Sequence, residues 1–437
     1  MFKFLDYSGY ATYSKSDFSL IKFITSKLSI FFINWKEALM ITGVLTYSQI
    51  TVPIVNFIKG EELEMFCFTE GILTYTYIIG FFHLFQSFLY KNLPCQKTYG
   101  TITPQGNIPE YNDNGLLAWF LTAFLEFKWL QYYSIKERRE FFEDLGSFHQ
   151  ALNYYGIVIS LYFYISAKLS DISKLNEPVF SGNPIIDFYK GVELHSKNRY
   201  GDVKMVINSR VGMMLWGMIN ILCIMATDTP NAILSGYLQL IYITKFFIWE
   251  SGYAKTTDIT LDRCGYYLFW GCISYVPSIY TSPTIYHYYY PNDNYTIMNI
   301  ATLVLGIFSI YTNWEIDCER TYLRERQMYD NSKEKSGYIR AEYKTSDGKI
   351  NTTYLVACGW MGIASNINYF FEIFAALMWT LAGTIPTNIF CYTYVIYLTV
   401  LLVHRTFRLE RKCLEKYGKS WLLYRNLVPY KIIPGFF

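Results

Sequence analysis

Residues 211–250 read VGMMLWGMINILCIMATDTPNAILSGYLQLIYITKFFIWE, and this stretch decides the fold. Two apolar runs, 211–227 and 231–250, are separated by a short link that contains Asp228 and Pro230. A helix of about 20 mostly apolar residues can cross the hydrocarbon core of a bilayer, which is about 30 Å thick. The stretch therefore predicts two membrane-spanning helices joined by a short connection.

Apolar stretches of similar length recur along the 437-residue chain. The ten predicted spans cover residues 35–58, 71–90, 115–134, 149–168, 211–227, 231–250, 264–289, 297–313, 354–382 and 386–403. Hydrophobic residues make up 52% of the chain and charged residues 17%, whereas a typical soluble domain has roughly 25% charged residues. We therefore predict an all-α, polytopic membrane protein with about ten transmembrane helices, which form a single integral membrane domain over residues 1–437.

The polar connections are distributed unevenly across the predicted membrane. An even number of spans puts the N-terminal segment on the same side as the tail. That side carries residues 1–34, 91–114, 169–210, 314–353 and 404–437, and most of the Lys and Arg outside the spans. The positive-inside rule assigns it to the cytosol, with the KERRE cluster at 136–140 as the exception. This asymmetry suits an enzyme that takes one partner from the cytosol and another from the bilayer.

Charge and cysteine content exclude two classes of partner. The formal net charge is +3, without the clustered excess of positive charge that a nucleic-acid interface needs. The nine Cys are scattered, with no CxxC pair and no Cys/His cluster, so that neither a metal site nor a disulfide framework is indicated. We expect membrane lipid as a partner, but no nucleic acid and no metal.

The tail after the last predicted span combines positive charge with aromatic rings. From His404 it reads HRTFRLERKCLEKYGKSWLLYRNLVPYKIIPGFF. Arg and Lys bind phosphate groups, and the interleaved Tyr and Trp residues offer flat faces on which a nucleotide base or a nicotinamide ring can stack. The alternative is a basic juxtamembrane segment that pairs with anionic lipid.

Two further segments carry polar groups at a membrane boundary. Residues 187–216 carry four charged side chains that could form part of a functional site: Glu193, Asp202, Lys204 and Arg210. A solvated loop with helix caps is an equal alternative. In residues 249–267 the carboxylates are Glu250, Asp258 and Asp262. A carboxylic acid beside an apolar pocket is a candidate proton donor, although these carboxylates can instead cap helices and face water. Lys245 lies deep in a predicted span and is expected to face protein.

The tail pattern HRxxRxxxKCxxKYGxxWxxYxxxVPYKIxPxxF resembles the carboxyl end of the sterol reductase family. That family groups delta-14 and delta-7 sterol reductases with the lamin B receptor. Residues 91–119, 191–216, 249–271 and 342–369 resemble further family motifs in the same order, so that the resemblance runs from about residue 80 to 437. The stretch 342–369, EYKTSDGKINTTYLVACGWMGIASNINY, most resembles the delta-7 branch.

The resemblance implies an NADPH-dependent reduction of a ring C=C bond of a sterol, as a step of sterol biosynthesis. An acid protonates one alkene carbon, and a hydride from NADPH joins the other. The implied substrate is the delta-7 bond of a 7-dehydrocholesterol-like sterol taken from the bilayer, with delta-14 reduction as the alternative. In a eukaryotic host the family implies the endoplasmic reticulum membrane, with the cofactor side in the cytosol.

The family also implies a set of site residues in this chain. Its cofactor lies against the C-terminal half, here residues 211–437. The matching positions are Arg320, Asn368, Tyr369, Cys413, Leu414, Glu415, Lys416, Tyr417 and Tyr424. The three carboxylates Glu250, Asp258 and Asp262 are expected to line the sterol end or to orient the proton donor.

Several positions depart from the family pattern. Ser365 and Asn366 replace an Arg-His pair, and His195, Ser196 and Lys197 replace an Asn-Pro-Arg. Ile316 replaces a family Lys four residues before Arg320, Met361 replaces the Trp of the GxWG segment, and Leu409 replaces the Asp of an Arg-Asp pair. Loss of a required proton-transfer group costs about 10²–10⁴ in rate. The departures therefore motivate an alternative of another class, a divergent, non-catalytic sterol-binding membrane protein.

Overall fold

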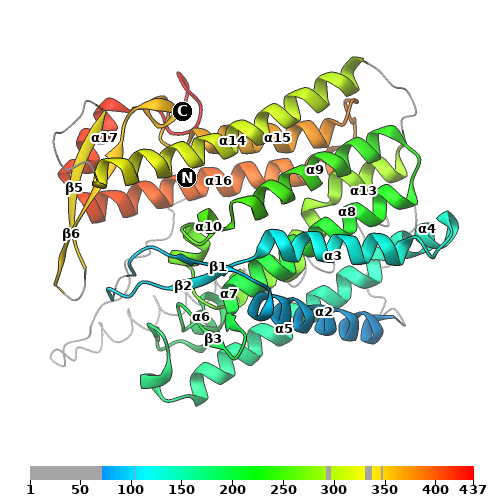
Figure 1. Ribbon diagram of the computed structural model, residues 1–437, viewed down its shortest axis with the longest axis horizontal. Helices are drawn as coiled ribbons and strands as arrows, with labels where there is room; N and C mark the ends of the chain where they lie inside the picture. The colour runs from blue at the N-terminus through cyan, green and yellow to red at the C-terminus, as the bar shows by residue number, and fades with distance from the viewer. Residues whose placement is uncertain (1–70, 104, 292–296, 330–336, 346–347) are drawn as a thin grey trace, which may run out of the picture.

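The computed structural model describes residues 71–437, except 104, 292–296, 330–336 and 346–347. The predicted span 35–58 and the N-terminal segment 1–34 lie outside the described residues. The described chain is mostly helical, as predicted. Its long helices lie side by side along the longest axis of the molecule, and Figure 1 shows α14, α15 and α16 together on one side, with α2, α3 and α5 on the other.

The helices differ widely in length. The long ones are α2 (Ile72–Asn92), α3 (Gly115–Leu130), α5 (Leu145–Leu169), α8 (Met214–Ala226), α9 (Pro230–Ile248), α14 (Ile297–Tyr329), α15 (Ile367–Leu381) and α16 (Thr393–Tyr417). The short ones are α4 (Ile135–Glu143), α6 (Pro184–Lys190), α7 (Val203–Met205), α10 (Glu250–Tyr253), α11 (Thr257–Thr260), α12 (Tyr266–Trp270), α13 (Ser282–Tyr289) and α17 (Lys419–Leu427). Two π-helices, η2 (Val206–Met213) and η3 (Gly271–Tyr280), continue α7 and α12.

Three two-stranded antiparallel sheets correct the all-α prediction. They are β1 (Gln96–Tyr99) with β2 (Glu110–Asp113), β3 (Lys197–Asn198) with β4 (Gly201–Asp202), and β5 (Tyr338–Lys344) with β6 (Ile350–Val356). The β5–β6 hairpin pairs Ala341 with Thr353 at its centre. It lies against α16 and α17 at the end of the molecule where the C-terminus also lies (Figure 1).

The predicted spans are confirmed in part. Four described helical segments are long and apolar enough to cross a membrane: Ile72–Asn92, Val203–Ala226, Ile297–Arg326 and Ile389–Tyr417. The count of ten spans stays a prediction. The proposed span 354–382 was wrong at its start, because Tyr354 to Val356 belong to β6 and the helix begins only at Ile367. The spans that begin at 297 and 386 extend well beyond 313 and 403 as continuous helices.

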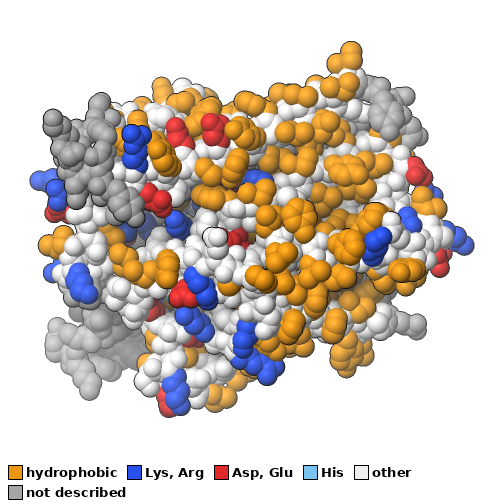
Figure 2. Space-filling model, viewed as in Figure 1, with side chains coloured by type: hydrophobic (Ala, Val, Ile, Leu, Met, Phe, Trp, Pro, Cys, Tyr) orange, Lys and Arg blue, Asp and Glu red, His pale blue; other side chains and the backbone are white. Residues whose placement is uncertain are grey.

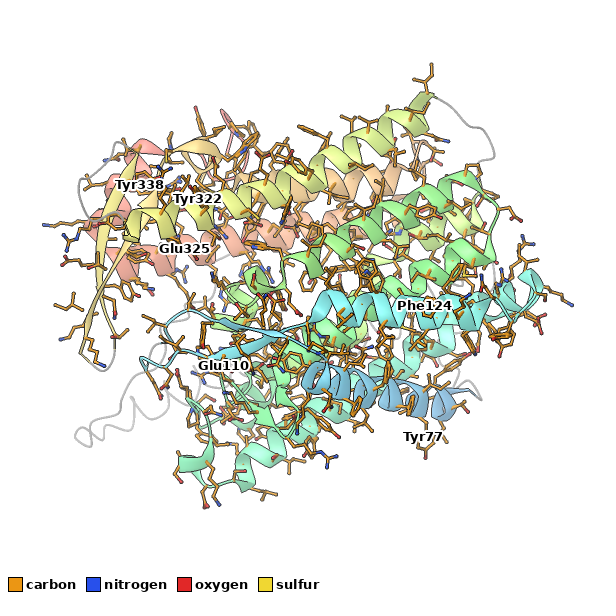
Figure 3. All side chains as sticks on the ribbon, viewed as in Figure 1. Tyr77, Glu110, Phe124, Tyr322, Glu325 and Tyr338 are labelled. Carbon is orange, nitrogen blue, oxygen red and sulfur yellow. The ribbon has the colours of Figure 1, made fainter. Side chains whose placement is uncertain are left out.

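The outer surface of α2 suits contact with lipid. Five of its exposed side chains, Leu73, Tyr77, Phe81, Leu84 and Phe88, recur every three or four residues and so share one face of the helix. Tyr77 is 76% exposed and points away from the molecule, as Figure 3 shows. In Figure 2, hydrophobic side chains cover the middle of the visible face, while Lys and Arg gather toward its ends. An apolar surface of this extent is typical of a membrane protein.

Aromatic rings dominate the core between these helices. Trp379 of α15 stacks on Tyr394 of α16, with ring centroids 5.9 Å apart. Trp216 of α8 packs edge-on against Trp379 and donates its Nε1–H to the buried Gln239 at 2.7 Å. This core fixes the positions of α8, α9, α15 and α16, the helices that carry much of the site described below.

A tight backbone contact joins the loop after α6 to the loop before α12. Gly191 has φ +85° and ψ 151°, a conformation that is essentially restricted to glycine. A Cβ atom at this position would lie 2.4 Å from the backbone carbonyl carbon of Cys264. Nearby, the Cys264 N–H donates to the Glu193 carbonyl at 2.9 Å. Glycine is therefore required here both for its conformation and for the close approach.

We expect Gly191→Ala to lower the unfolding temperature in detergent, because it adds a collision with the backbone to about 1–3 kcal/mol of conformational strain. The matched control is Gly182→Ala, since Gly182 also has a positive φ of +80° but open space around its Cα. Thermal unfolding of both purified variants checks the prediction. Equal unfolding temperatures for the two variants would show that the contact at Gly191 does not constrain the fold.

Candidate active site

A chain of polar side chains joins α14 to α15. The Asn368 side-chain N–H donates to Asp317 Oδ1 at 3.1 Å, and the Asn368 carbonyl accepts from Asn313 Nδ2 at 2.8 Å. Asp317 also pairs with Arg320 at 3.3 Å. Because positions 313, 317 and 320 are spaced by four and three residues, they share one face of α14. Two residues predicted to bind the cofactor, Arg320 and Asn368, are thus linked through Asp317.

The chain of contacts continues toward the middle of the helices. The Lys245 ammonium, on α9, donates to Asn313 Oδ1 and lies 4.9 Å from the centre of the Tyr242 ring. The Tyr242 hydroxyl donates to Glu372 Oε1 on α15 at 3.1 Å. Lys245 faces protein, as its depth in the span predicted. Charged residues inside apolar helices are costly and usually functional, so this group belongs to the candidate site.

Two arginines of α16 bind two of the predicted carboxylates. Arg405 pairs with Asp258, and Arg408 pairs with Asp262 through both guanidinium nitrogens, one of them at 3.2 Å. Charge-assisted pairs of this kind are among the strongest polar contacts in proteins. Both aspartates therefore act as acceptors that hold α16 against residues 257–262. Tyr267 lies close enough to interact electrostatically with both pairs.

Aromatic rings and a lysine converge where the hairpin meets the tail. The Lys416 ammonium lies 3.8 Å from the centre of the Tyr343 ring and 5.2 Å from that of Tyr417. Tyr424 stacks on Trp421, with centroids 4.9 Å apart. Burial raises the pKa of Tyr424 to about 12, so its hydroxyl is neutral at physiological pH. The predicted residues Lys416, Tyr417 and Tyr424 thus lie in one cluster with the β5–β6 hairpin.

Arg324 links this cluster to α14. Its guanidinium interacts electrostatically with Cys413, Tyr417 and Tyr424. Within the described part of the chain, neither Arg324 nor Lys416 forms an ion pair with a carboxylate. Two cations without counter-ions at a helix–hairpin junction are suited to bind phosphate groups.

Of the remaining residues predicted to bind the cofactor, some lie near the site and others lie on the surface of α16. The Cys413 thiol is partly buried and free, and Tyr369 lies near Arg405, Glu372 and Arg320. Leu414 and Glu415 are exposed on the surface of α16. The structure therefore brings Cys413 toward Arg324 but does not bring Leu414 and Glu415 into the cluster, because successive residues of a helix point in different directions.

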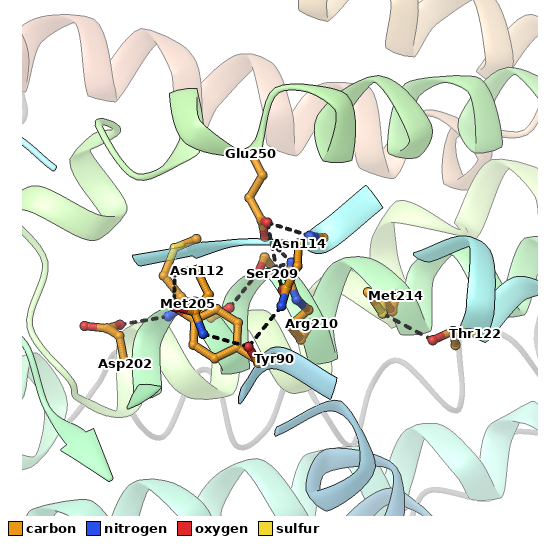
Figure 4. A network of polar contacts seen from close by, with 11 residues as sticks. Tyr90, Asn112, Asn114, Thr122, Asp202, Met205, Ser209, Arg210, Met214 and Glu250 are labelled. Atoms are coloured by element: carbon orange, nitrogen blue, oxygen red, sulfur yellow. Dashed lines mark hydrogen bonds and ion pairs between the residues drawn. The ribbon is translucent and has the colours of Figure 1, made fainter. Parts of the chain in front are cut away.

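Glu250 belongs to a separate buried network, which Figure 4 shows. Its carboxylate pairs with Arg210 of η2, whose Nη2 lies 2.8 Å from Glu250 Oε2, and accepts from the Gly115 N–H at 2.9 Å. Arg210 also donates to Asn114 Oδ1 at 2.8 Å. Both charged side chains are completely buried. This arrangement joins η2, α3 and α10, and it leaves the proton-donor role of Glu250 a prediction.

The residues at the junction fit NADPH. Asn368 is 6% exposed, and its Oδ1 has no hydrogen-bond partner, which leaves an acceptor for the carboxamide N–H of a nicotinamide. Arg324 and Lys416 offer charge to phosphates, and Tyr417 offers a ring face. In the described residues no group of three His, Cys, Asp or Glu side chains is arranged to hold a metal ion.

The departures from the family pattern have clear structural settings. Ile316 is completely buried in an apolar cluster with Val356 and Met361, beneath the β5–β6 hairpin. Beside Leu409, the Glu410 carboxylate pairs with Arg425 at 3.2 Å and with Lys431 at 3.1 Å. Positions 316 and 361 thus serve packing, and the carboxylate nearest to position 409 ties the tail to α16.

Sequence reasoning missed several residues of this site: Arg324, Asn313, Asp317, Tyr242 and Glu372. Two signals were available in the sequence. Positions 313, 317, 320 and 324 repeat every three or four residues, which marks one polar face of a helix. Glu372 is the one charged residue in the apolar run 367–381, and a lone acid in such a run marks a functional position.

The chain is similar to known proteins over most of its length. A family model described as the ergosterol biosynthesis ERG4/ERG24 family matches residues 17–437. The 7-dehydrocholesterol reductase of Arabidopsis thaliana is 36% identical over 371 residues, which cover 82% of this chain and 84% of that protein. The 7-dehydrocholesterol reductase of Xenopus laevis is 32% identical over 415 residues, 89% and 86% of the two chains. The delta(14)-sterol reductase of Methylotuvimicrobium alcaliphilum is 28% identical over 357 residues, 78% of each.

We expect Glu250→Ala to destabilise the protein by about 3–5 kcal/mol, because it leaves the Arg210 guanidinium buried without its carboxylate. The matched control is Glu110→Ala, which removes a surface carboxylate paired with Lys97 and 45% exposed. Thermal unfolding in detergent measures both effects. The double variant Arg210→Met/Glu250→Met should recover much of the loss. A Glu250→Ala variant as stable as the control would contradict a structural role for the pair.

Proposed function

Because this chain belongs to the ergosterol biosynthesis ERG4/ERG24 family of sterol reductases, we propose that it reduces the delta-7 C=C bond of a sterol with NADPH. The family places it among membrane oxidoreductases that act on CH–CH bonds. The delta-7 assignment is supported by the similarity to 7-dehydrocholesterol reductases, which exceeds that to the delta(14)-sterol reductase of Methylotuvimicrobium alcaliphilum, at 28% identity.

The observation that carries the proposal is the junction of α14, α15 and α16. A buried acceptor without a partner, Asn368 Oδ1, lies on the same network as the cation Arg320. Arg324 and Lys416, whose charges suit phosphate groups, lie on the tail side of this junction. Polar groups within apolar helices lie on its core side. A nicotinamide nucleotide needs the cations and the free acceptor, and a lipid substrate that must be protonated needs the polar groups of the core side.

In this proposal the cofactor supplies a hydride to one alkene carbon when it is bound. Asn368 would accept a hydrogen bond from the nicotinamide carboxamide and so orient the ring. Arg324 and Lys416 would bind phosphate groups, and Tyr417 would pack against the nucleotide. The surrounding helices exclude water, which strengthens each of these polar contacts.

The proton for the other alkene carbon is assigned to Tyr267. Asp258 and Asp262 pair with Arg405 and Arg408, so that they orient these arginines. Tyr267 lies near both ion pairs, and the Arg405 guanidinium would stabilise the phenolate that proton donation leaves behind. Water at the cytosolic side then returns the proton to the phenolate.

We expect membranes that contain the protein to convert 7-dehydrocholesterol to cholesterol when NADPH is supplied. Mass spectrometry of the extracted sterols measures the conversion. Tyr267→Phe should lower kcat by at least about 10²-fold and keep NADPH binding. The matched control Tyr266→Phe, which alters the neighbouring phenol, should keep activity.

Other outcomes of this assay would contradict parts of the proposal. Reduction of a delta-14 sterol diene alone would show that the assignment of the double bond is wrong. NADPH and sterol binding without any product would support the non-catalytic alternative that Leu409 motivates. Equal loss of activity in the two tyrosine variants would remove Tyr267 as the proton donor.

We expect Lys416→Ala to raise the KM for NADPH by roughly 10- to 100-fold, the effect of losing one charged hydrogen bond to a ligand. The control is Lys419→Ala, because Lys419 is exposed at the start of α17 and close in sequence. Steady-state kinetics at fixed ionic strength separates the two variants. A KM that changes equally in both would mean that Lys416 contributes only to the overall positive charge.

A further inference from the structure

A polar group to which the proposed reaction assigns no step lies between α9, α14 and α15, three helices that pack against one another. It consists of Lys245 with Tyr242 on α9 and Glu372 on α15. Lys245 is held by Asn313 of α14, and Glu372 accepts from the Tyr242 hydroxyl at 3.1 Å. We refer to these four residues as the interhelical polar cluster.

The two opposite charges of this cluster do not touch. The Lys245 ammonium and the Glu372 carboxylate interact electrostatically, yet they are more than 4.0 Å apart. A single bent hydroxyl oxygen that accepts from an ammonium and donates to a carboxylate holds the two groups about 4.5–5 Å apart, given hydrogen bonds of 2.7–3.0 Å, which is beyond direct contact. The arrangement is therefore open to a bridging hydroxyl group.

Both charged groups also have unused hydrogen-bonding capacity. An ammonium has three donors, and Lys245 makes one hydrogen bond, to Asn313. A carboxylate has two acceptor oxygens, and Glu372 uses Oε1 for Tyr242. Two donors of Lys245 and one carboxylate oxygen of Glu372 thus remain available, and a hydroxyl group can bind to both residues whereas a hydrocarbon cannot.

The cluster is accessible from the lipid side. On α9, Ile241 and Ile248 lie one turn before and one turn after Lys245 and are 37% and 55% exposed. Lys245 and Glu372 are themselves partly exposed. A lipid that enters beside α9 would meet the cluster directly, and the aromatic core behind it, where Tyr242 packs against Trp379 at 5.5 Å, suits flat fused rings.

Other polar groups face the cluster from each neighbouring helix. They are Asp317 and Cys318 on α14, Arg405 and Tyr394 on α16, and Tyr280 on η3. Arg405 reaches Glu372 from the side of the Asp258 pair, so the cluster borders the proposed reaction site. Glu372 follows Tyr369 by three residues, which is about 4.5 Å along the axis of α15.

We propose that Lys245 and Glu372 bind the 3-hydroxyl group of the sterol, with the hydroxyl oxygen accepting from Lys245 and its proton donated to Glu372. The inference rests on the proposed function for the identity of the lipid. A sterol carries its hydroxyl on the ring next to the one that is reduced, so a hydroxyl site must lie close to the cofactor site. The short separation of Glu372 from Tyr369 meets this requirement, and the hydroxyl then sets the depth at which the ring double bond is held.

The test compares a delta-7 sterol with its 3-deoxy analogue, which has hydrogen in place of the hydroxyl, in the full-length protein. The wild type should reduce the 3-deoxy analogue at least about 10-fold less efficiently, because the two charged groups then lose their ligand. Glu372→Gln and Lys245→Met should raise the KM for the hydroxyl sterol by a similar factor and leave the KM for the analogue unchanged. The control Lys128→Met, at an exposed lysine of α3 that donates to Gln131, should behave as the wild type with both lipids.

Two outcomes of this comparison overturn the inference. Equal losses with both substrates would show that the two residues serve the reaction or the fold. Variants that still prefer the hydroxyl sterol as strongly as the wild type would show that the hydroxyl is bound elsewhere. If no sterol is reduced, the proposed function fails. The inference is then tested by equilibrium binding in nanodiscs, which compares the hydroxyl sterol with its 3-deoxy analogue in the wild type and the variants. Glu372→Gln decides alone if Lys245→Met does not fold.

Discussion

A charge inside a hydrocarbon layer is stable only when the protein itself supplies a partner, and in this molecule one short segment supplies three. Residues 249–267 carry Glu250, Asp258 and Asp262. Glu250 pairs with Arg210 of η2, while the two aspartates pair with arginines of α16. The segment therefore holds the first half of the chain against the last long helix, and the position of the tail relative to the core depends on these ion pairs.

The same segment is linked through Arg405 to the residues that we propose for the cofactor and those that we propose for the lipid. Arg405 binds Asp258 and also lies near Tyr369 and Glu372. It is thus shared by the ion pairs, by Tyr369, which the family resemblance assigns to the cofactor, and by the interhelical polar cluster. On the proposed function, loss of the Asp258 carboxylate would leave Arg405 without this partner and so affect both proposed sites. Asp258 and Asp262 are in this sense positioning residues.

Hydrophobic runs predicted most of the long helices. The prediction was wrong where a run could form either a helix or a strand. Tyr354, Leu355 and Val356 are as apolar as a helix but form β6, because short β-branched and aromatic runs fit a strand equally well. The site was harder to predict. Glu250 and Asp258 look alike in the sequence, and their roles differ only because Arg210 and Arg405 reach them from distant parts of the chain. Leu414 and Glu415 follow a matching motif but face outward, which depends on the rotation of α16.

The departures from the family pattern have a small effect on the charge near the proposed cofactor residues. Ile316 fills an apolar cluster, and Arg324, eight residues later on the same helix, supplies a cation near Tyr417. Leu409 removes a negative charge beside Arg408, while Glu410 is occupied by Arg425 and Lys431. On the proposed function, the loss of an acid near the residues proposed to bind phosphate would make that region more positive, which would favour binding of the anionic cofactor. Under that proposal, divergence at these positions would therefore act on cofactor binding before it acts on the chemistry of the ring.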